Sequence, residues 1–258
     1  SSSSHSGAVA FNRASLLVNS RRGAGGRVEI EGDDLWIGNA SRIDATGATG
    51  GGRVLIGGDW QGGGTLRQAT TVGMSADSVI DASATDNGDG GTVVLWSNVT
   101  DATSITTVNG SLFAKGGFNG GNGGQIETSG HELQVEGASV NASAAKGQGG
   151  EWLLDPYNIT ITTSADTNVS NSSNTFTSNN TSSNINVTTI TGALNSGTSV
   201  TVQTGGGGGE IGDLQVNTAI TKTGGTDATL TLKAHNNVVV SGAISSSNAK
   251  PPQISQRA

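Results

Sequence analysis

The sequence lacks several residue types that define common classes of protein. It contains no cysteine, which excludes disulfide bonds and thiolate catalysis. No run of about 18 apolar residues occurs, so the sequence predicts no membrane-spanning helix. Aromatic residues make up 3% and charged residues 13% of the 258 positions. Because disordered chains combine low hydrophobicity with high charge, this balance favours a thin, repetitive core instead.

The chain is also poor in basic residues and in proline. It has 13 Lys and Arg against 20 Asp and Glu, a net charge of −7, which argues against nucleic acid or an anionic membrane as the main partner. Three prolines accompany 42 glycines without a Gly-X-Y period, which excludes collagen and favours tight turns between short strands. Residues 1–6 show no signal-peptide pattern, so we expect an internal segment of a longer protein.

A unit of Ser, apolar residues and a turn recurs ahead of pairs of adjacent glycines. The second glycines of these pairs are residues 26, 52, 91, 124 and 150, which are separated by 26, 39, 33 and 26 residues. Repeats of this length indicate a solenoid. The apolar residues alternate with period two and are mostly β-branched, and no helical face is visible. We therefore predict an all-β fold, a right-handed parallel β-helix (β-solenoid) with extra-helical loops, the hand being that of β crossovers.

The repeat also predicts which side chains fill the bore and where loops interrupt the coils. The unequal intervals indicate extra loops, and two candidates are Gly62–Gly64 and Asp86–Asp89. Pro156 should end a strand because it cannot donate to a ladder. The predicted bore residues are Ile43, Val54, Ile56, Val79, Val93, Leu112, Ile126, Leu133, Val135 and Val140.

The composition divides the chain into four parts. Residues 1–162 carry the β-helix coils with Gly-Gly repeats, and residues 186–247 continue the β-helix with a looser pattern. Between them, 18 of the 23 residues at 163–185 are Ser, Thr or Asn, which predicts a long loop or a poorly ordered, protease-sensitive arm. Residues 248–258 contain two adjacent prolines and no strand pattern, so we expect a tail.

Four segments resemble one family. They are similar, in the family's order, to the large bacterial exoproteins of the filamentous-haemagglutinin type, closest to the high-molecular-weight adhesins of two-partner secretion. The resemblance covers 25–161 well and 186–245 more loosely, and its segments are Ile56–Gly62, Glu127–Leu133, Glu151–Ile161 and Ala228–Ala234.

The resemblance implies a secreted β-helix at the bacterial cell surface or outer membrane. It implies export through an outer-membrane secretion partner barrel, and contact with a host-cell or matrix surface through the full-length protein. The family's secretion domain carries Asn-Pro motifs, and none occurs here. The chain therefore resembles the region behind that domain, which in close relatives belongs to a pro-piece ending near the segment at 151–156.

Candidate catalytic and metal-binding residues are few. Asp44 and Asp81 occupy matching places in two repeats, but later repeats place Lys115 or Ala114, and then Asn141, at that position. A turn position that accepts Asp or Asn explains this pattern more simply than paired acid–base catalysis.

Other polar motifs have equally simple explanations. The segment 86–90 resembles half of a calcium loop without its bidentate Glu, so turn chemistry is favoured. His5, His131 and His235 are scattered, and His131 follows Gly130 where a capping hydrogen bond is expected. We assign no catalytic, cofactor-binding or metal residue and no cofactor.

Acceptor sequons for N-glycosylation are dense, and many arise by chance in a chain rich in Asn, Ser and Thr. The possible sites are Asn39, Asn98, Asn109, Asn141, Asn158, Asn168, Asn171, Asn179, Asn180 and Asn186.

Three functional hypotheses follow from these observations. The first is a non-catalytic stalk or pro-piece segment of a secreted adhesin exported by a two-partner system. The second is a subunit of an extracellular fibre built by end-to-end self-association, because solenoid ends pair with other chains unless they are capped. The third is a polysaccharide-acting β-helix enzyme.

Overall fold

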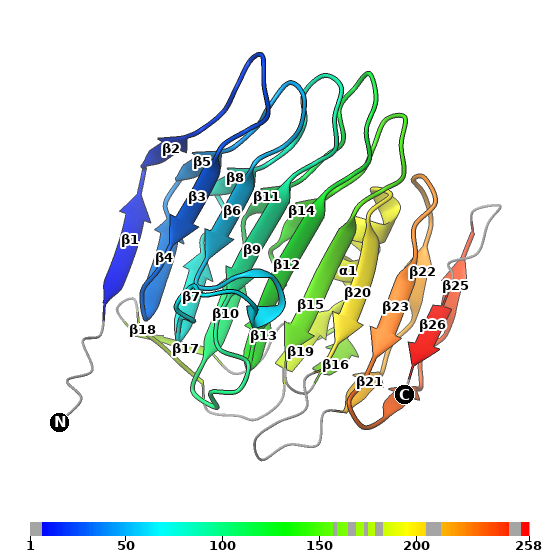
Figure 1. The fold of residues 1–258 in the computed structure, drawn as a ribbon. Coiled ribbons are helices and arrows are strands. Elements are labelled where there is room, and N and C mark those ends of the chain that lie inside the picture. Colours follow the sequence, from blue (N-terminus) through cyan, green and yellow to red (C-terminus); the bar gives the residue numbers. More distant parts are fainter. Residues whose placement is uncertain are drawn as a thin grey trace.

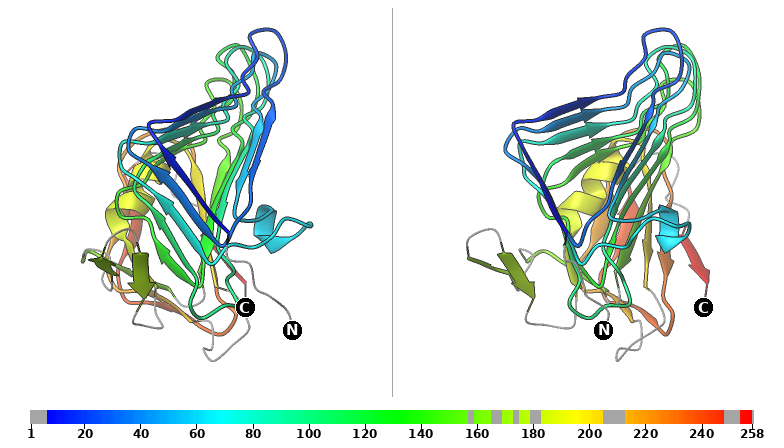
Figure 2. Two further views of the ribbon diagram at one scale, coloured as in Figure 1. Left: turned by 90° about the vertical axis from the view of Figure 1, so that its left-hand side faces the viewer. Right: turned by 60° about the vertical axis from the view of Figure 1, so that its left-hand side comes forward.

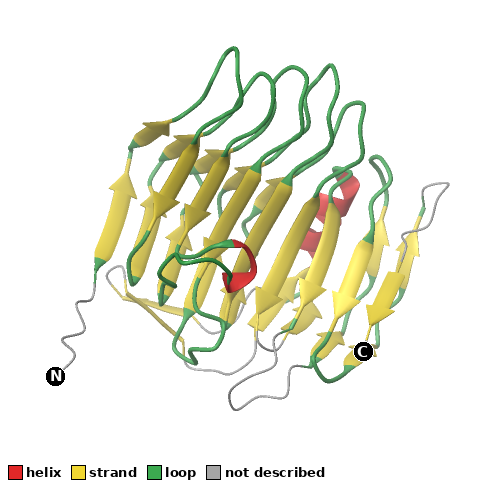
Figure 3. Ribbon diagram, in the orientation of Figure 1, coloured by secondary structure: helices red, strands yellow, loops and turns green. Residues whose placement is uncertain are grey.

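The computed structural model describes residues 7–156, 159–164, 169–172, 175–178, 183–204, 213–247 and 254–257. The chain forms a parallel β-helix, in which each of the first five coils contributes one strand to each of three faces (Figure 1). Strands dominate the described residues, with one α-helix and one short 3₁₀ turn (Figure 3). The predicted β-solenoid is thereby confirmed.

In each coil the chain passes through faces 1, 2 and 3 in that order. Face 1 contains β1 (Ala8–Asn12), β4 (Asp34–Gly38), β7 (Thr71–Met74), β10 (Ile105–Val108) and β13 (Glu132–Gln134). Face 2 contains β2 (Ser15–Leu17), β5 (Arg42–Asp44), β8 (Val79–Asp81), β11 (Ser111–Phe113) and β14 (Ser139–Asn141). Face 3 has eight strands, β3 (Arg27–Ile30), β6 (Arg53–Ile56), β9 (Thr92–Trp96), β12 (Gln125–Gly130), β15 (Glu151–Pro156), β20 (Ser199–Gln203), β23 (Leu230–Lys233) and β26 (Ile254–Arg257).

Beyond β15 the other two faces change. A four-stranded parallel sheet continues face 1 in the order β19 (Ser183–Asn186), β16 (Ile159–Thr162), β21 (Leu214–Val216) and β24 (Val238–Val240), with β19 against β13. On face 2, α1 (Val187–Asn195) lies between β14 and β22 (Ile220–Lys222), and β22 pairs with β25 (Ile244–Ser246). The insertion between β16 and β19 contains an antiparallel pair, β17 (Val169–Ser172) and β18 (Thr175–Ser178).

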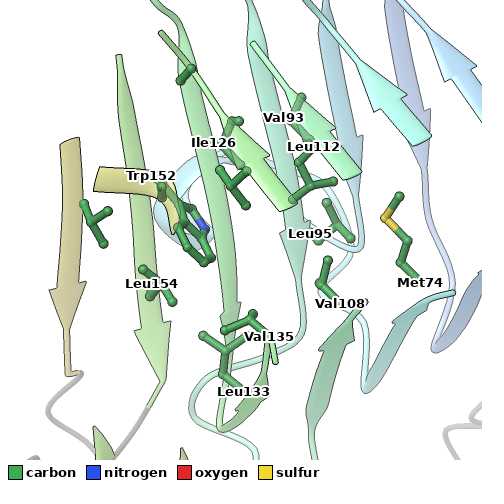
Figure 4. Packing of buried hydrophobic residues seen from close by; sticks show 14 of the residues in the cluster. Met74, Val93, Leu95, Val108, Leu112, Ile126, Leu133, Val135, Trp152 and Leu154 are labelled. Atoms are coloured by element: carbon green, nitrogen blue, oxygen red, sulfur yellow. The ribbon is translucent and has the colours of Figure 1, made fainter. Parts of the chain in front are cut away.

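The bore is filled by columns of apolar side chains that stack from coil to coil (Figure 4). In one column Val54 pairs with Val93, which pairs with Ile126, which pairs with Trp152. Trp152 is fully buried, and its indole N–H donates to Thr128 Oγ1 at 3.0 Å, so the ring is accommodated without an unpaired polar atom.

Nine of the ten predicted bore residues belong to this core, and one is wrong. Val79 is half-buried, whereas its neighbour Ile80 is fully buried and pairs with Ile43 and Leu112. Because Val79 and Ile80 are both apolar, alternation does not show which of them points inward. A shift of one residue exchanges the inward and outward faces of the strand.

Loops project from the corner between faces 2 and 3 and stack into a thin layer, which we call the fin (residues 19–25, 46–51, 83–90, 115–123 and 143–149; Figure 2). At its base the second glycine of each pair donates to a backbone carbonyl across the loop, as Gly124 does to Ala114 at 2.7 Å. A Cβ on Gly124 would lie 2.0 Å from the carbonyl oxygen of Gly91. The repeated glycines are therefore required by close backbone approach rather than by flexibility.

Three expectations about the second half need correction. Val187–Asn195 lies in the part expected to continue the β-helix but forms α1, because Asn186 caps the helix and Val187, Ile190 and Leu194 bury one helical face. The segment 163–185 is not wholly loop, since it holds β17, β18 and the start of β19. The expected tail contains β26, which pairs in parallel with β23, because backbone pairing at a sheet edge needs little apolar signal. Strand β15 ends at Pro156 as predicted.

Candidate functional site

The strongest sequence candidate for chemistry is the stacked pair Asp44 and Asp81. These residues end β5 and β8 and lie directly opposite each other in the parallel ladder. The next positions in this column are Phe113 on β11 and Asn141 on β14. The expected Lys115 or Ala114 was wrong because the strand register is set by the buried Leu112 beneath Ile80.

Each polar member of this column closes a turn. Asp44 Oδ1 accepts from the backbone N–H of Thr46 at 3.0 Å and from its hydroxyl at 2.7 Å. Asp81 Oδ1 accepts from the N–H of Ser83 at 3.0 Å, and Asn141 Oδ1 accepts from that of Ser143 at 2.9 Å. The same two-residue Asx turn thus recurs wherever this position is Asp or Asn, as the turn interpretation predicts.

The electrostatics around Asp44 favour its ionised carboxylate. Burial acts to raise the pKa of Asp44, but hydrogen bonds from Thr46, Asn19 and Arg42 outweigh it and lower the pKa to about 2. Arg42 reaches both groups, with its guanidinium nitrogen 3.3 Å from Asp44 Oδ2 and 3.9 Å from Asp81 Oδ2. A carboxylate with so low a pKa does not serve as a general acid near neutral pH.

The acidic loop at 86–90 lies in the fin and binds the next coil. Asp86 Oδ1 accepts from Asn119 Nδ2 at 2.6 Å, and Asp89 Oδ1 accepts from the N–H of Asn122 at 2.7 Å. Both side chains therefore join neighbouring fin loops. In the part of the chain that the structure describes, no three His, Asp or Glu side chains gather as metal ligands would.

The histidines do not come together. His131 is buried at the corner after β12, and its ring Nδ1 lies 3.2 Å from the carbonyl oxygen of Val99. Its backbone N–H donates to Ser104 Oγ at 3.2 Å. The backbone N–H of His235 donates to Thr204 Oγ1 at 3.0 Å. His5 lies outside the described residues.

Sequence reasoning missed a buried acid on the outer side of face 3. Glu127 is fully buried, and its carboxylate accepts from the N–H of Gln61 at 2.8 Å and from Ser129 Oγ at 2.9 Å. Gln61 belongs to η1 (Trp60–Gly62), in a loop that covers this face with Trp60 and Leu66. The glycine run at 62–64 predicted a loop but gave no sign of which face the loop covers.

The possible glycosylation sites differ in access. Asn39 is exposed. Asn98, Asn109 and Asn141 are half-buried, and Asn186 is buried, where its side chain accepts from the N–H of Thr188 at 2.9 Å. Asn158, Asn168, Asn179 and Asn180 lie outside the described residues, and only the backbone is described for Asn171.

No family model matches the sequence, and a search of curated proteins found no match either. Within the described ranges, no helix has the length and apolar character that crossing a membrane requires.

Proposed function

We propose that this chain is a structural stalk or pro-piece segment of a secreted bacterial adhesin exported by a two-partner system. The observation that carries the proposal is the unbroken eight-stranded ladder of face 3. With strands about 4.8 Å apart, its seven spacings extend about 34 Å along the axis. A ladder of this kind holds one part of a protein at a fixed distance from another.

The segments that resemble the adhesin family support this proposal by their position. The segment Glu127–Leu133 runs from β12 of face 3 into β13, and the segment Glu151–Ile161 contains β15 of face 3 and most of β16. Ile56–Gly62 begins at the last residue of β6, and Ala228–Ala234 contains β23. All four thus include part of a face-3 strand, in coils 2, 4, 5 and 7, which suits an internally repeated stalk.

The test uses the full-length exoprotein with coils 2 to 5 (residues 31–156) deleted in frame. Secretion through the outer-membrane partner and surface display are measured for the full-length protein and the deletion variant. Binding to host-cell monolayers is measured for the full-length protein and for the purified chain alone. We expect the purified chain to bind cells far less than the full-length protein, and the deletion to reduce surface display. Cell binding by the isolated chain that equals that of the full-length protein would contradict a stalk role.

A second candidate is a fibre subunit, which the apolar lining of a hollow beside β1, β2 and β3 supports. The hollow has a volume of about 610 Å³ and is lined by side chains that include the half-buried Val9, Phe11 and Leu16. Apolar side chains at an open sheet end favour pairing with another chain. Sedimentation at several concentrations separates the two candidates, because a fibre subunit grows in mass with concentration and a stalk segment does not.

A further inference from the structure

A groove runs along the axis of the β-helix where the outer side of face 2 meets the fin, and its lining combines turns after the face-2 strands with fin residues. Its volume is about 540 Å³. The lining comes from the turns of six successive coils, from Thr46 in the second to Thr226 in the seventh. At about 4.8 Å per coil these turns span about 24 Å, so the groove suits an extended chain better than a compact molecule.

Hydroxyl groups line the groove in five of its six coils, and the fourth coil contributes Lys115, Gly116 and Phe118 instead. The contributing residues are Thr46, Ser83, Ser143, Ser196 and Thr226. The hydroxyl of Thr46 already donates to Asp44 and that of Ser196 to the carbonyl oxygen of Ala193, so these two can act as acceptors toward a ligand. The Asx turns fix the geometry of this row, because Asp81 orients Ser83 and Asn141 orients Ser143 through their backbone N–H groups. A regular row of neutral donors and acceptors complements a ligand that itself carries many hydroxyls.

An aromatic ring stands beside this row. Phe118 is 72% exposed and lies in the fin, where its ring lines the groove. Close by, Lys115 Nζ lies over the ring of Phe113, 5.3 Å from its centroid, which holds the ammonium group at the groove wall. The C–H face of a pyranose ring packs against an exposed aromatic face while its hydroxyls remain free for hydrogen bonds.

Charge in the groove is balanced. Among the described lining residues, Lys115 is the one cation and Asp81 the one carboxylate. A polyanion such as a sulfated polysaccharide would meet the carboxylate as well as the ammonium, on a chain whose net charge is −7. The balance favours an uncharged ligand.

We propose that this groove binds a linear, uncharged oligosaccharide, with Phe118 stacked on one sugar ring and Lys115, Asp81 and the hydroxyl row hydrogen-bonded to its hydroxyls. The inference does not depend on the stalk proposal, because the coils are the same whether or not the groove holds a saccharide. It gives this segment a contact surface of its own.

The test is isothermal titration of the purified chain with chitohexaose, cellohexaose, maltohexaose and a heparin hexasaccharide. We expect at least one neutral hexasaccharide to bind. Phe118→Ala should weaken that binding roughly tenfold, since a stacking contact is worth about 1 kcal/mol or slightly more. Phe118→Trp should restore it.

Leu17→Ala is the matched control, because Leu17 is also exposed, at 61%, but lies outside the groove. It should leave binding unchanged, and thermal melting should show that all variants fold. The proposal is overturned if no neutral hexasaccharide binds, if Phe118→Ala and Leu17→Ala bind alike, or if heparin alone binds and is displaced by salt.

Discussion

Replacing Ile126 by Asp tests the stacked bore most directly. Ile126 is fully buried on β12 between Val93 and Trp152 of the adjacent coils. Removing its side chain from the core loses about 2–3 kcal/mol of transfer free energy. A buried carboxylate without a partner costs about 3 kcal/mol or more in addition. We expect the free energy of unfolding to fall by about 5 kcal/mol, which is enough to unfold a domain of ordinary stability.

The matched control is Gln125→Asp, one residue earlier on the same strand. Gln125 is exposed and has Thr92 and Glu151 as neighbours across the ladder. Its change should cost no more than about 1 kcal/mol, from repulsion by Glu151. Urea unfolding followed by far-ultraviolet circular dichroism gives both values. Equal and small losses for Ile126→Asp and Gln125→Asp would refute the stacked core.

Three further predictions concern the fin, the turn column and the open end. Gly124→Ala should lower the thermal midpoint by several degrees, whereas Gly192→Ala in α1, which has open space around its Cβ, should raise it. Because folding lowers the pKa of Asp44 to about 2, the ionised carboxylate stabilises the fold fully above pH about 4, and this stabilisation is lost as the pH falls through 2. Between pH 7 and pH 2.5 the free energy of unfolding of Asp44→Asn, measured with urea, should therefore fall by about 1–2 kcal/mol less than that of the wild type. If coils stack end to end, Phe11→Glu should keep the chain monomeric in sedimentation runs where the wild type associates.

The first five coils could be predicted from the sequence because two independent signals agree there. Alternating apolar residues mark the strands, and glycine pairs mark the points where backbones touch, as at Gly91 and Gly124. The Asp44 and Asp81 pair was predicted for the same reason, since both residues follow the same repeat. Where two apolar residues adjoin, as at Val79 and Ile80, alternation alone does not choose the inward one, and only pairing with Ile43 decides.

The second half was harder to predict because its local signals conflict. The stretch from Ile185 to Ile190 is rich in β-branched residues, which favour strands, yet burial of one helical face against β14 and β22 outweighs that preference. A second example comes from the first half, where Arg67 in the loop at 57–70 forms an ion pair with Asp33. Both contacts join segments distant in sequence, and no local pattern encodes them.

The unequal repeat lengths show where this fold leaves room for function. Between the glycines at 52 and 91 the chain adds both the loop at 57–70 and a fin loop at 83–90, and these account for the longest interval of 39 residues. The strands between those loops, β7 and β8, still pair in register with the strands of the coils before and after them. Bore positions and the glycine pairs are constrained by neighbours above and below, whereas the loops beyond them differ in length from coil to coil. The exposed Phe118 and the loop that covers Glu127 both lie at corners, so chemistry specific to this chain is to be sought there rather than on the faces.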